Sequence, residues 1–221
     1  MDEASKTLAL LSEEELACLQ GKGLDIGCGA DPVKPDAQCF DKAQGDANRI
    51  TDFLSALESY DYVFSSHCLE HMYDPRKTIV DWWKLVRPGG TMFVIVPDED
   101  LYEQGYWPSL FNGDHKATFT ISKERSWSPV SVNVLDLARS LKDATVVSAR
   151  LQDHGYRRDY TARVWPRALV KTAIRIRRAV SRHAPALRAW VDSLYFRLRF
   201  PMDQTSGPAV AQNILIARKD R

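Results

Sequence analysis

The stretch Gly23-Leu24-Asp25-Ile26-Gly27-Cys28-Gly29-Ala30 decides the fold class of this chain. Leu24 and Ile26 form a short apolar run that is typical of a buried parallel strand. The run leads into a turn with two glycines, whose backbone can bend sharply and approach a ligand because no Cβ intervenes. In an open α/β sheet, ligands bind beyond the carboxyl ends of the strands. The stretch predicts a strand that ends at a binding site, although a tight turn without a ligand has the same pattern.

Strand-like and helix-like segments alternate after this turn. Such alternation is the pattern of βαβ units, which form parallel sheets. We therefore expect an α/β fold with a mixed sheet of seven strands, helices on both faces and an antiparallel pairing of the last two strands. The expected strands after the first are 38–41, 49–53, 60–66, 91–97, 145–151 and 210–217, and the expected helices include 12–20, 76–86 and 131–141.

The composition is that of a globular protein. The chain of 221 residues is 44% hydrophobic and 27% charged, with a formal net charge of +1, and we expect one domain over residues 1–221. No apolar run approaches the roughly 18 residues that span a bilayer, and the N-terminus lacks the features of a signal peptide. Because the four cysteines show no C-x-x-C spacing, we expect reduced thiols, no disulfide framework, no metal site and a cytoplasmic location.

The positive charge is concentrated near the C-terminus. Residues 157–199 contain 12 Lys and Arg against 2 Asp, a net charge of +10, which leaves −9 for the remainder. Apolar residues recur at helical spacing from Trp165 to Val180 and from Leu187 to Leu198. We therefore expect a basic helical hairpin at about 157–205, inserted before the last strand.

Two interpretations of this insertion stay open. Its apolar stripes pack against each other or the domain, or they contact a membrane surface or lipid phosphate. Nucleic acid is not an expected partner, because no nucleic-acid motif accompanies the charge.

Further motifs follow the glycine turn in order. Asp41 ends the second strand, Ser65-Ser66-His67-Cys68-Leu69-Glu70-His71 follows the fourth, and Leu85-Val86-Arg87-Pro88-Gly89-Gly90 precedes the fifth. With Asp25-x-Gly27-x-Gly29, this array resembles the class I S-adenosylmethionine-dependent methyltransferases of the type 11 group over residues 22–97. The resemblance implies a Rossmann-like methyltransferase fold, the cofactor S-adenosyl-L-methionine and the product S-adenosyl-L-homocysteine. A nicotinamide cofactor is disfavoured, because Pro32 stands where the third glycine of G-x-G-x-x-G belongs.

The resemblance also implies where the cofactor binds. The glycine turn lines its amino-acid part, Asp41 holds its ribose hydroxyls, and Ser66 and His67 flank its methionine part. The adenine lies near Asp52 and Phe53, although the short segment after Asp41 leaves Asp46 open as an alternative to Asp52. The expected cofactor-binding residues are Asp25, Gly27, Cys28, Gly29, Asp41, Asp52, Phe53, Ser66 and His67.

Candidate catalytic residues lie in two polar segments. An acceptor hydroxyl is a poor nucleophile near neutral pH and benefits from a base. We expect His115 to be that base, with Asp114 orienting it or contacting the acceptor. His71 is a second candidate, and a purely structural role at a helix start fits it equally well. Tyr102, Tyr106 and Trp107 either form a stacking wall for a ring or pack under the loop.

The predicted function is methyl transfer to an oxygen of a sugar or glycan. The acceptor class depends on a looser resemblance of 203–207 and the strand after it to methyltransferases of bacterial surface-glycan or nucleotide-sugar modification. A glycan built on a lipid carrier would place the cytoplasmic protein at the inner membrane surface. The alternatives are methylation of another small metabolite and a non-catalytic module that binds the cofactor. The acceptor atom and the oligomeric state stay open.

Overall fold

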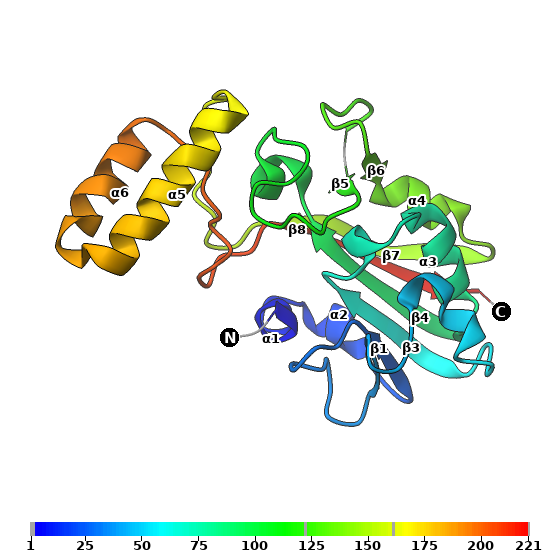
Figure 1. The fold of residues 1–221 in the computed structure, drawn as a ribbon. Helices are drawn as coiled ribbons and strands as arrows, with labels where there is room; N and C mark the ends of the chain where they lie inside the picture. Colours follow the sequence, from blue (N-terminus) through cyan, green and yellow to red (C-terminus); the bar gives the residue numbers. More distant parts are fainter. Residues whose placement is uncertain (1–2, 122, 161, 221) are drawn as a thin grey trace.

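The centre of the fold is a six-stranded mixed sheet in the order β2-β1-β3-β4-β8-β7 (Figure 1). The computed structural model describes residues 3–121, 123–160 and 162–220. The first four strands of the sheet are parallel, and β8 pairs antiparallel with both β4 and β7. The strands are β1 Gly23–Ile26, β2 Gln38–Phe40, β3 Tyr60–Ser66, β4 Val86–Pro97, β7 Ala144–Gln152 and β8 Gln212–Lys219.

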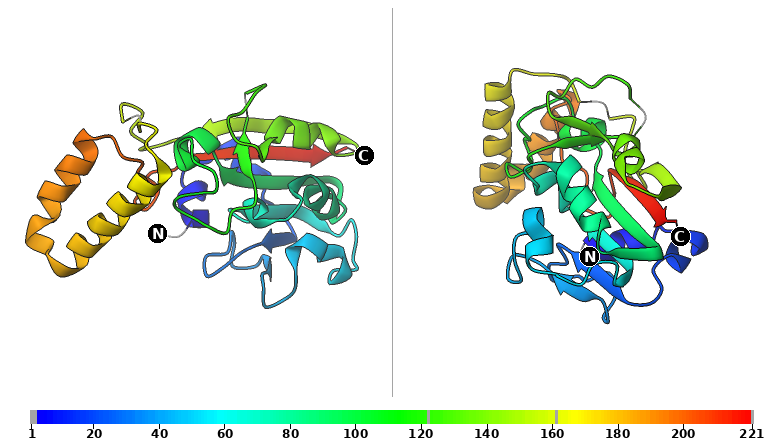
Figure 2. Two further views of the ribbon diagram at one scale, coloured as in Figure 1. Left: turned by 45° about the horizontal axis from the view of Figure 1, so that its top comes forward. Right: turned by 90° about the vertical axis from the view of Figure 1, so that its right-hand side faces the viewer.

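Helices cover both faces of the sheet (Figure 1, Figure 2). Successive strand residues point to opposite faces, so Val63 belongs to one buried cluster and Phe64 to the other. The helices α3 Pro75–Trp83 and α4 Val134–Ser140 pack on the Val63 side, and the segment with α1 Glu3–Leu8 and α2 Glu13–Ala17 packs on the Phe64 side. The expectation of helices on both faces is confirmed.

The strand expected at 49–53 is wrong, and the sheet therefore has six strands instead of seven. Residues Ala47–Asp52 form a short 3-10 helix, η1. Asp46 caps it, because one carboxylate oxygen accepts hydrogen bonds from the backbone N–H and the side-chain amide of Asn48 at 2.9 Å. Such local bonds favour a helical turn over a strand.

A separate parallel pair accounts for two further strands, β5 Thr118–Thr120 and β6 Ser131–Asn133. The helix expected from Ser131 therefore begins only at Val134, where Asn133 caps it by accepting a hydrogen bond from the Leu135 N–H. The remaining short helices are η2 Leu69–His71, η3 Glu99–Glu103 and η4 Pro185–Leu187.

Cys28 and Cys39 form a disulfide, so the expectation of reduced thiols without a disulfide is wrong. β1 and β2 are neighbouring parallel strands, with Asp25 opposite Cys39, and this register brings the two cysteine Cα atoms to 5.7 Å. Sequence spacing could not reveal the pair, because the sheet creates the proximity. The cysteines consequently give no argument for a reducing compartment.

The basic insertion forms a helical hairpin of α5 Arg167–His183 and α6 Arg188–Arg197, which projects from one end of the sheet (Figure 1, Figure 2). It lies between β7 and β8, as the sequence predicts. Tyr106 links the start of the hairpin to the rest of the domain, because its hydroxyl accepts a hydrogen bond from the Trp165 N–H at 2.7 Å. Val170, Tyr195 and Phe200 complete a small buried cluster with Tyr106. Within the described residues, every helix is too short or too polar to cross a bilayer.

One ion pair joins α2 to the far edge of the sheet. Arg150 on β7 donates from Nε and Nη2 to the two carboxylate oxygens of buried Glu15, at 2.9 and 2.8 Å. This hydrogen-bonded pair lowers the pKa of Glu15 from 4.5 to about 2. A pKa lowered by folding means that the ionised side chain stabilises the protein above about pH 4.5 and that this contribution is lost as the pH falls toward 2.

We predict that Glu15→Gln lowers the free energy of unfolding at pH 7 and that the deficit shrinks between pH 4.5 and 2. Denaturant unfolding across that pH range measures both effects. Glu14→Gln, at an exposed position of the same helix, is the matched control and should behave like the wild type. A deficit that stays constant down to pH 2 would contradict the assignment.

Candidate active site

The glycine turn after β1 has a backbone that other residues adopt only with strain. Gly27 and Gly29 have φ values of +80° and +53°, in the left-handed region that favours glycine. A Cβ on Gly27 would lie 2.8 Å from the Cβ of Cys68, whereas a Cβ on Gly29 would meet no atom within 4 Å. The turn is therefore packed at its first glycine and faces open space at its second.

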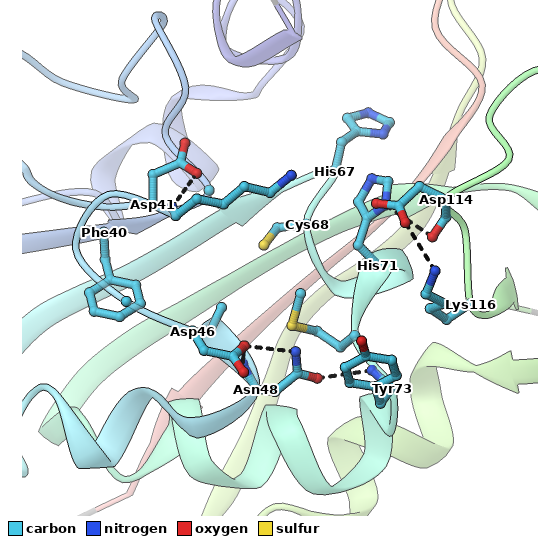
Figure 3. Close-up of a pocket in the computed structure, with 15 residues that line it drawn as sticks. Phe40, Asp41, Asp46, Asn48, His67, Cys68, His71, Tyr73, Asp114 and Lys116 are labelled. Carbon is cyan, nitrogen blue, oxygen red and sulfur yellow. Dashed lines mark hydrogen bonds and ion pairs between the residues drawn. The ribbon is translucent and has the colours of Figure 1, made fainter.

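Two cavities meet at this turn. One has a volume of about 700 Å³ and the other of about 360 Å³, and Gly27 and His67 line both. Figure 3 shows the larger cavity, with Asp41 at one end and His71 beside Asp114 at the other. An elongated ligand can occupy both cavities by passing over the turn.

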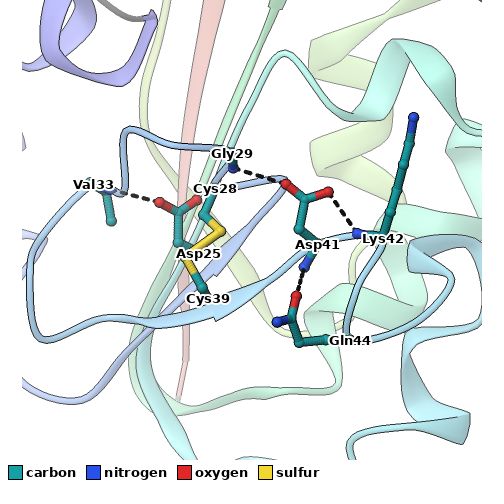
Figure 4. The surroundings of a disulfide bond; sticks show 8 residues. All are labelled: Asp25, Cys28, Gly29, Val33, Cys39, Asp41, Lys42 and Gln44. Carbon is teal, nitrogen blue, oxygen red and sulfur yellow. Dashed lines mark hydrogen bonds between the residues drawn. A yellow bond between two sulfur atoms is a disulfide. The ribbon is translucent and has the colours of Figure 1, made fainter.

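Asp41 places a carboxylate at the tip of β2. One of its oxygens accepts a hydrogen bond from the Gly29 N–H at 2.9 Å, and the other accepts one from the Lys42 N–H at 2.6 Å (Figure 4). The Cys28–Cys39 disulfide crosses between the same two segments. Asp41 lines the larger cavity, and its fixed oxygens can accept hydrogen bonds from ligand hydroxyls, as the sequence predicts for a ribose.

The smaller cavity contains two polar groups from the predicted set. Asp25 accepts a hydrogen bond from the Val33 N–H at 2.7 Å, and burial raises its pKa from 3.8 to about 6 against the effect of that bond. The Ser66 hydroxyl is buried and has no hydrogen-bond partner among the described residues. Both residues, with Cys28 and Gly29, line the cavity, so a ligand there can satisfy Ser66.

Asp52 and Phe53 do not line the cavities found among the described residues, and their contact with the adenine stays a prediction. The η1 turn directs Asp52 to an ion pair with Arg49, and the Phe53 ring packs against Phe40 with centroids 6.1 Å apart. Asp46, the alternative left open by the sequence, lines the larger cavity with Ala47 and Asn48.

The histidines at the other end of the larger cavity have separate carboxylate partners. His71 Nδ1 lies 3.1 Å from an oxygen of Asp114, while His115 Nδ1 lies 2.7 Å from an oxygen of Glu103. Asp114 therefore does not orient His115, which was one of its two expected roles, and its contact with the acceptor stays a prediction. His115 is buried, and Asp114 is largely exposed.

Sequence reasoning missed two buried acids, Glu70 and Glu103. Glu70 lies beside His67, with its carboxylate 3.3 Å from Nδ1. Burial raises the pKa of Glu70, but the hydrogen bond with His67 and the nearby His115 and His71 outweigh burial and lower it. The only signal for Glu70 is its place before His71, and Glu103 has no sequence signal because its histidine is far along the chain.

The aromatic residues after β4 do not form a common wall. Tyr106 is buried and holds the base of the hairpin, where its hydroxyl also donates to the Trp165 carbonyl at 3.0 Å. Tyr102 packs on His115 and Phe111, with ring centroids 5.4 and 5.8 Å away. The packing interpretation is therefore confirmed for Tyr106.

A sequence profile of the family described as "Methyltransferase domain" matches residues 3–127, more than half of the chain. The chain belongs to this methyltransferase family. The predicted class I methyltransferase fold is thereby confirmed in its Rossmann-like architecture, although the main sheet has six strands instead of seven. A search of curated proteins finds no match.

Two solved structures share the fold of this methyltransferase. A protein from Bacillus halodurans C-125 that is described as a methyltransferase has 11% identity and a TM-score of 0.52, and the alignment covers 100% of this chain and 99% of that one. Phosphoethanolamine N-methyltransferase 2 from Haemonchus contortus, in complex with S-adenosyl-L-methionine, has 13% identity and a TM-score of 0.51, over 98% of this chain and 53% of that one. Identities this low establish the likeness of fold alone.

We predict that Asp41→Asn weakens binding of S-adenosylhomocysteine to this methyltransferase at least about tenfold, because a hydrogen bond to a charged group contributes about 1.5–3 kcal/mol. Titration calorimetry measures the affinity. Asp36→Asn, at an exposed position before β2, is the control and should bind like the wild type. Equal affinity of the wild type and Asp41→Asn would remove Asp41 from the cofactor site.

Proposed function

We propose that this methyltransferase transfers a methyl group from S-adenosyl-L-methionine to a hydroxyl oxygen of a sugar or glycan. The observation that carries the proposal is a pair of adjoining cavities. The larger one connects the carboxylate of Asp41 to the histidine end, and the smaller one, with Asp25 and Ser66, meets it at Gly27 and His67. The polar groups of both cavities fit the two ends of this cofactor. When bound, it supplies a methyl group on a sulfonium, which is activated for displacement.

Residues of three strand ends would hold the cofactor. Asp41 after β2 would accept hydrogen bonds from the ribose hydroxyls, and the unpartnered Ser66 hydroxyl at the end of β3 would meet the amino-acid part in the smaller cavity. Gly29 leaves space because no side chain stands over its backbone. Asp46 lies at the side where the adenine is expected.

The far end of the larger cavity suits an acceptor rich in hydroxyl groups. Asp114 and Lys116 line it and offer an acceptor and a donor of hydrogen bonds. Tyr73 stands at its edge with 81% of its surface exposed, so that its ring is available to pack against the apolar face of a sugar. This combination supports a sugar over an apolar metabolite.

The histidine end would assist loss of the acceptor proton. As the carbon–oxygen bond forms and the carbon–sulfur bond breaks, the acceptor hydroxyl must release its proton. His71 borders the cavity, and Asp114 holds its Nδ1, which leaves Nε2 as the ring nitrogen that can face the acceptor. His115 is buried next to His71, with ring centroids 5.1 Å apart. It would assist through His71 instead of contacting the acceptor itself.

The direct test is uptake of tritiated methyl groups by a panel of sugar nucleotides, glycan oligomers, small amines and carboxylic acids. The proposal predicts labelling of sugar hydroxyls, with labelled carbon bonded to oxygen. Exclusive labelling of an amine or a non-sugar metabolite would contradict the acceptor class. Failure to bind S-adenosylhomocysteine would also contradict the assignment of S-adenosyl-L-methionine as the cofactor.

We predict that His71→Ala lowers turnover of the best acceptor at least about a hundredfold, the lower end of the range for general acid–base assistance. Affinity for S-adenosylhomocysteine should stay unchanged, since His71 lies away from Asp41 (Figure 3). The control is His154→Ala, at an exposed position outside the site. Wild-type turnover in His71→Ala would show that His71 takes no part in proton loss.

We also propose that the hairpin of α5 and α6 contacts an anionic membrane surface. The two helices bury only Val170 and Tyr195, so mutual packing leaves much of their apolar stripes in contact with water. Trp190, Leu187 and Ile176 are 67%, 55% and 54% exposed. Exposed apolar side chains on a strongly basic helix favour the interface of an anionic membrane, where each basic residue adds about 1 kcal/mol.

We predict that Trp190→Ser together with Leu187→Ser reduces co-flotation with vesicles containing anionic lipid, because both changes remove exposed apolar surface. Neutral vesicles should bind neither protein strongly. Leu57→Ser, at a 52% exposed position outside the hairpin, is the control and should bind like the wild type. Absence of wild-type binding to anionic vesicles at low salt would contradict membrane contact.

A further inference from the structure

We propose that Glu70, His71 and His115 bind one divalent transition-metal cation at the acceptor end of the larger cavity. Each residue offers one ligand atom, and the three atoms lie within 4.8 Å of one another. They come from two segments, η2 and the loop before β5, which the fold brings together. The set contains no cysteine, so the absence of a C-x-x-C spacing, on which the expectation of no metal depended, does not bear on it.

Both histidines have a carboxylate beside Nδ1, as histidines that bind a metal through Nε2 do. Asp114 holds Nδ1 of His71 at 3.1 Å, and Glu103 holds Nδ1 of His115 at 2.7 Å. A carboxylate at Nδ1 takes the N–H of the neutral ring, so the lone pair that binds a metal is on Nε2. In metal sites a carboxylate behind the imidazole fixes the tautomer and the ring orientation in this way.

Glu70 supplies a buried carboxylate with unused capacity. Only 1% of its surface is exposed, and one oxygen lies 3.3 Å from Nδ1 of His67. The other oxygen, Oε2, is buried and has no hydrogen-bond partner among the described residues. A buried carboxylate oxygen without a partner costs free energy, and a cation between Glu70 and the two histidines would remove that cost.

The two segments are held together before any ligand binds. The backbone N–H groups of Lys116 and Ala117 donate to the Glu70 carbonyl at 2.7 and 3.3 Å. The rings of His71 and His115 meet edge to face, and the Tyr102 ring also packs against His115. The ligand set is therefore part of a packed element, and little ordering has to accompany binding.

The donor types indicate the class of metal. Two imidazoles and one carboxylate are the donors of zinc and of other first-row divalent cations, including iron(II), and calcium and magnesium prefer oxygen ligands. Three protein ligands leave coordination positions open. Because His71 lines the cavity, an open position would face the acceptor side.

Such a cation would explain how the histidine end assists proton loss. A hydroxyl bound to a divalent cation releases its proton more readily than a free one, so the imidazoles would act through the metal instead of as free bases. This role depends on the proposed function, whereas metal binding does not.

Metal binding is tested on the full chain without cofactor or acceptor. Protein treated with a chelator and dialysed is titrated with Zn²⁺ by calorimetry and with Co²⁺ by visible absorption. We expect one Zn²⁺ per chain and a Co²⁺ spectrum that Zn²⁺ abolishes. E70Q and H115Q should each weaken Zn²⁺ binding at least about a hundredfold, and E103Q about tenfold to a hundredfold through loss of the carboxylate behind His115. H154Q, at an exposed histidine, should bind as the wild type does.

H71Q covers the case in which the buried variants do not fold, because the His71 side chain is 25% exposed. Folded H71Q should lose Zn²⁺ binding and the rise in melting temperature that Zn²⁺ gives the wild type. The proposal is overturned if the wild type binds Zn²⁺ no more tightly than H71Q, or if H154Q loses as much affinity as E70Q. Zn²⁺ binding without sugar methylation would contradict only the proposed function, and methylation without Zn²⁺ binding would contradict only the metal site.

Discussion

The attachment of the glycine turn to β2 is the constraint on which the rest of the site depends. The Gly27 N–H donates to the Phe40 carbonyl at 2.8 Å, and the Gly29 N–H donates to the Asp41 carboxylate. The Cys28–Cys39 disulfide adds a covalent link between the same segments. Together they fix the path of the backbone over which the two cavities meet, and they do so with few residues.

These two hydrogen bonds and the disulfide compensate for the short connection between β1 and β2. The segment between β1 and β2 contains no helix, and Pro32 and Pro35 disfavour one because proline lacks the backbone N–H. Without a helix to pack on the sheet, the loop has to be fixed at its ends. Asp25 contributes by accepting the Val33 N–H within the loop. This side of the two cavities is thus held by hydrogen bonds from backbone N–H groups and by one disulfide instead of by a packed helix.

Local patterns predicted the elements that are both long and buried. The apolar runs of β3 and of the end of β4, and the Asp74-Pro75 start of α3, lie where the sequence places them. The strand expected at 49–53 is wrong, because the Asp46 side chain caps a helical turn there. The partners of the cysteines and histidines also escaped prediction. The pairing of β1 with β2 brings Cys28 near Cys39, and the fold of the loops places Asp114 beside His71 and Glu103 beside His115.

We infer that one ligand spans both cavities across Gly27, and a crystal structure of the protein with S-adenosylhomocysteine would show where each part of that ligand binds. We expect density for the ribose at the Asp41 carboxylate, for the amino-acid part beside Ser66, and for the sulfur near the shared wall at Gly27 and His67. Density for the nucleoside elsewhere on the protein, or side chains that close the passage over Gly27, would contradict it.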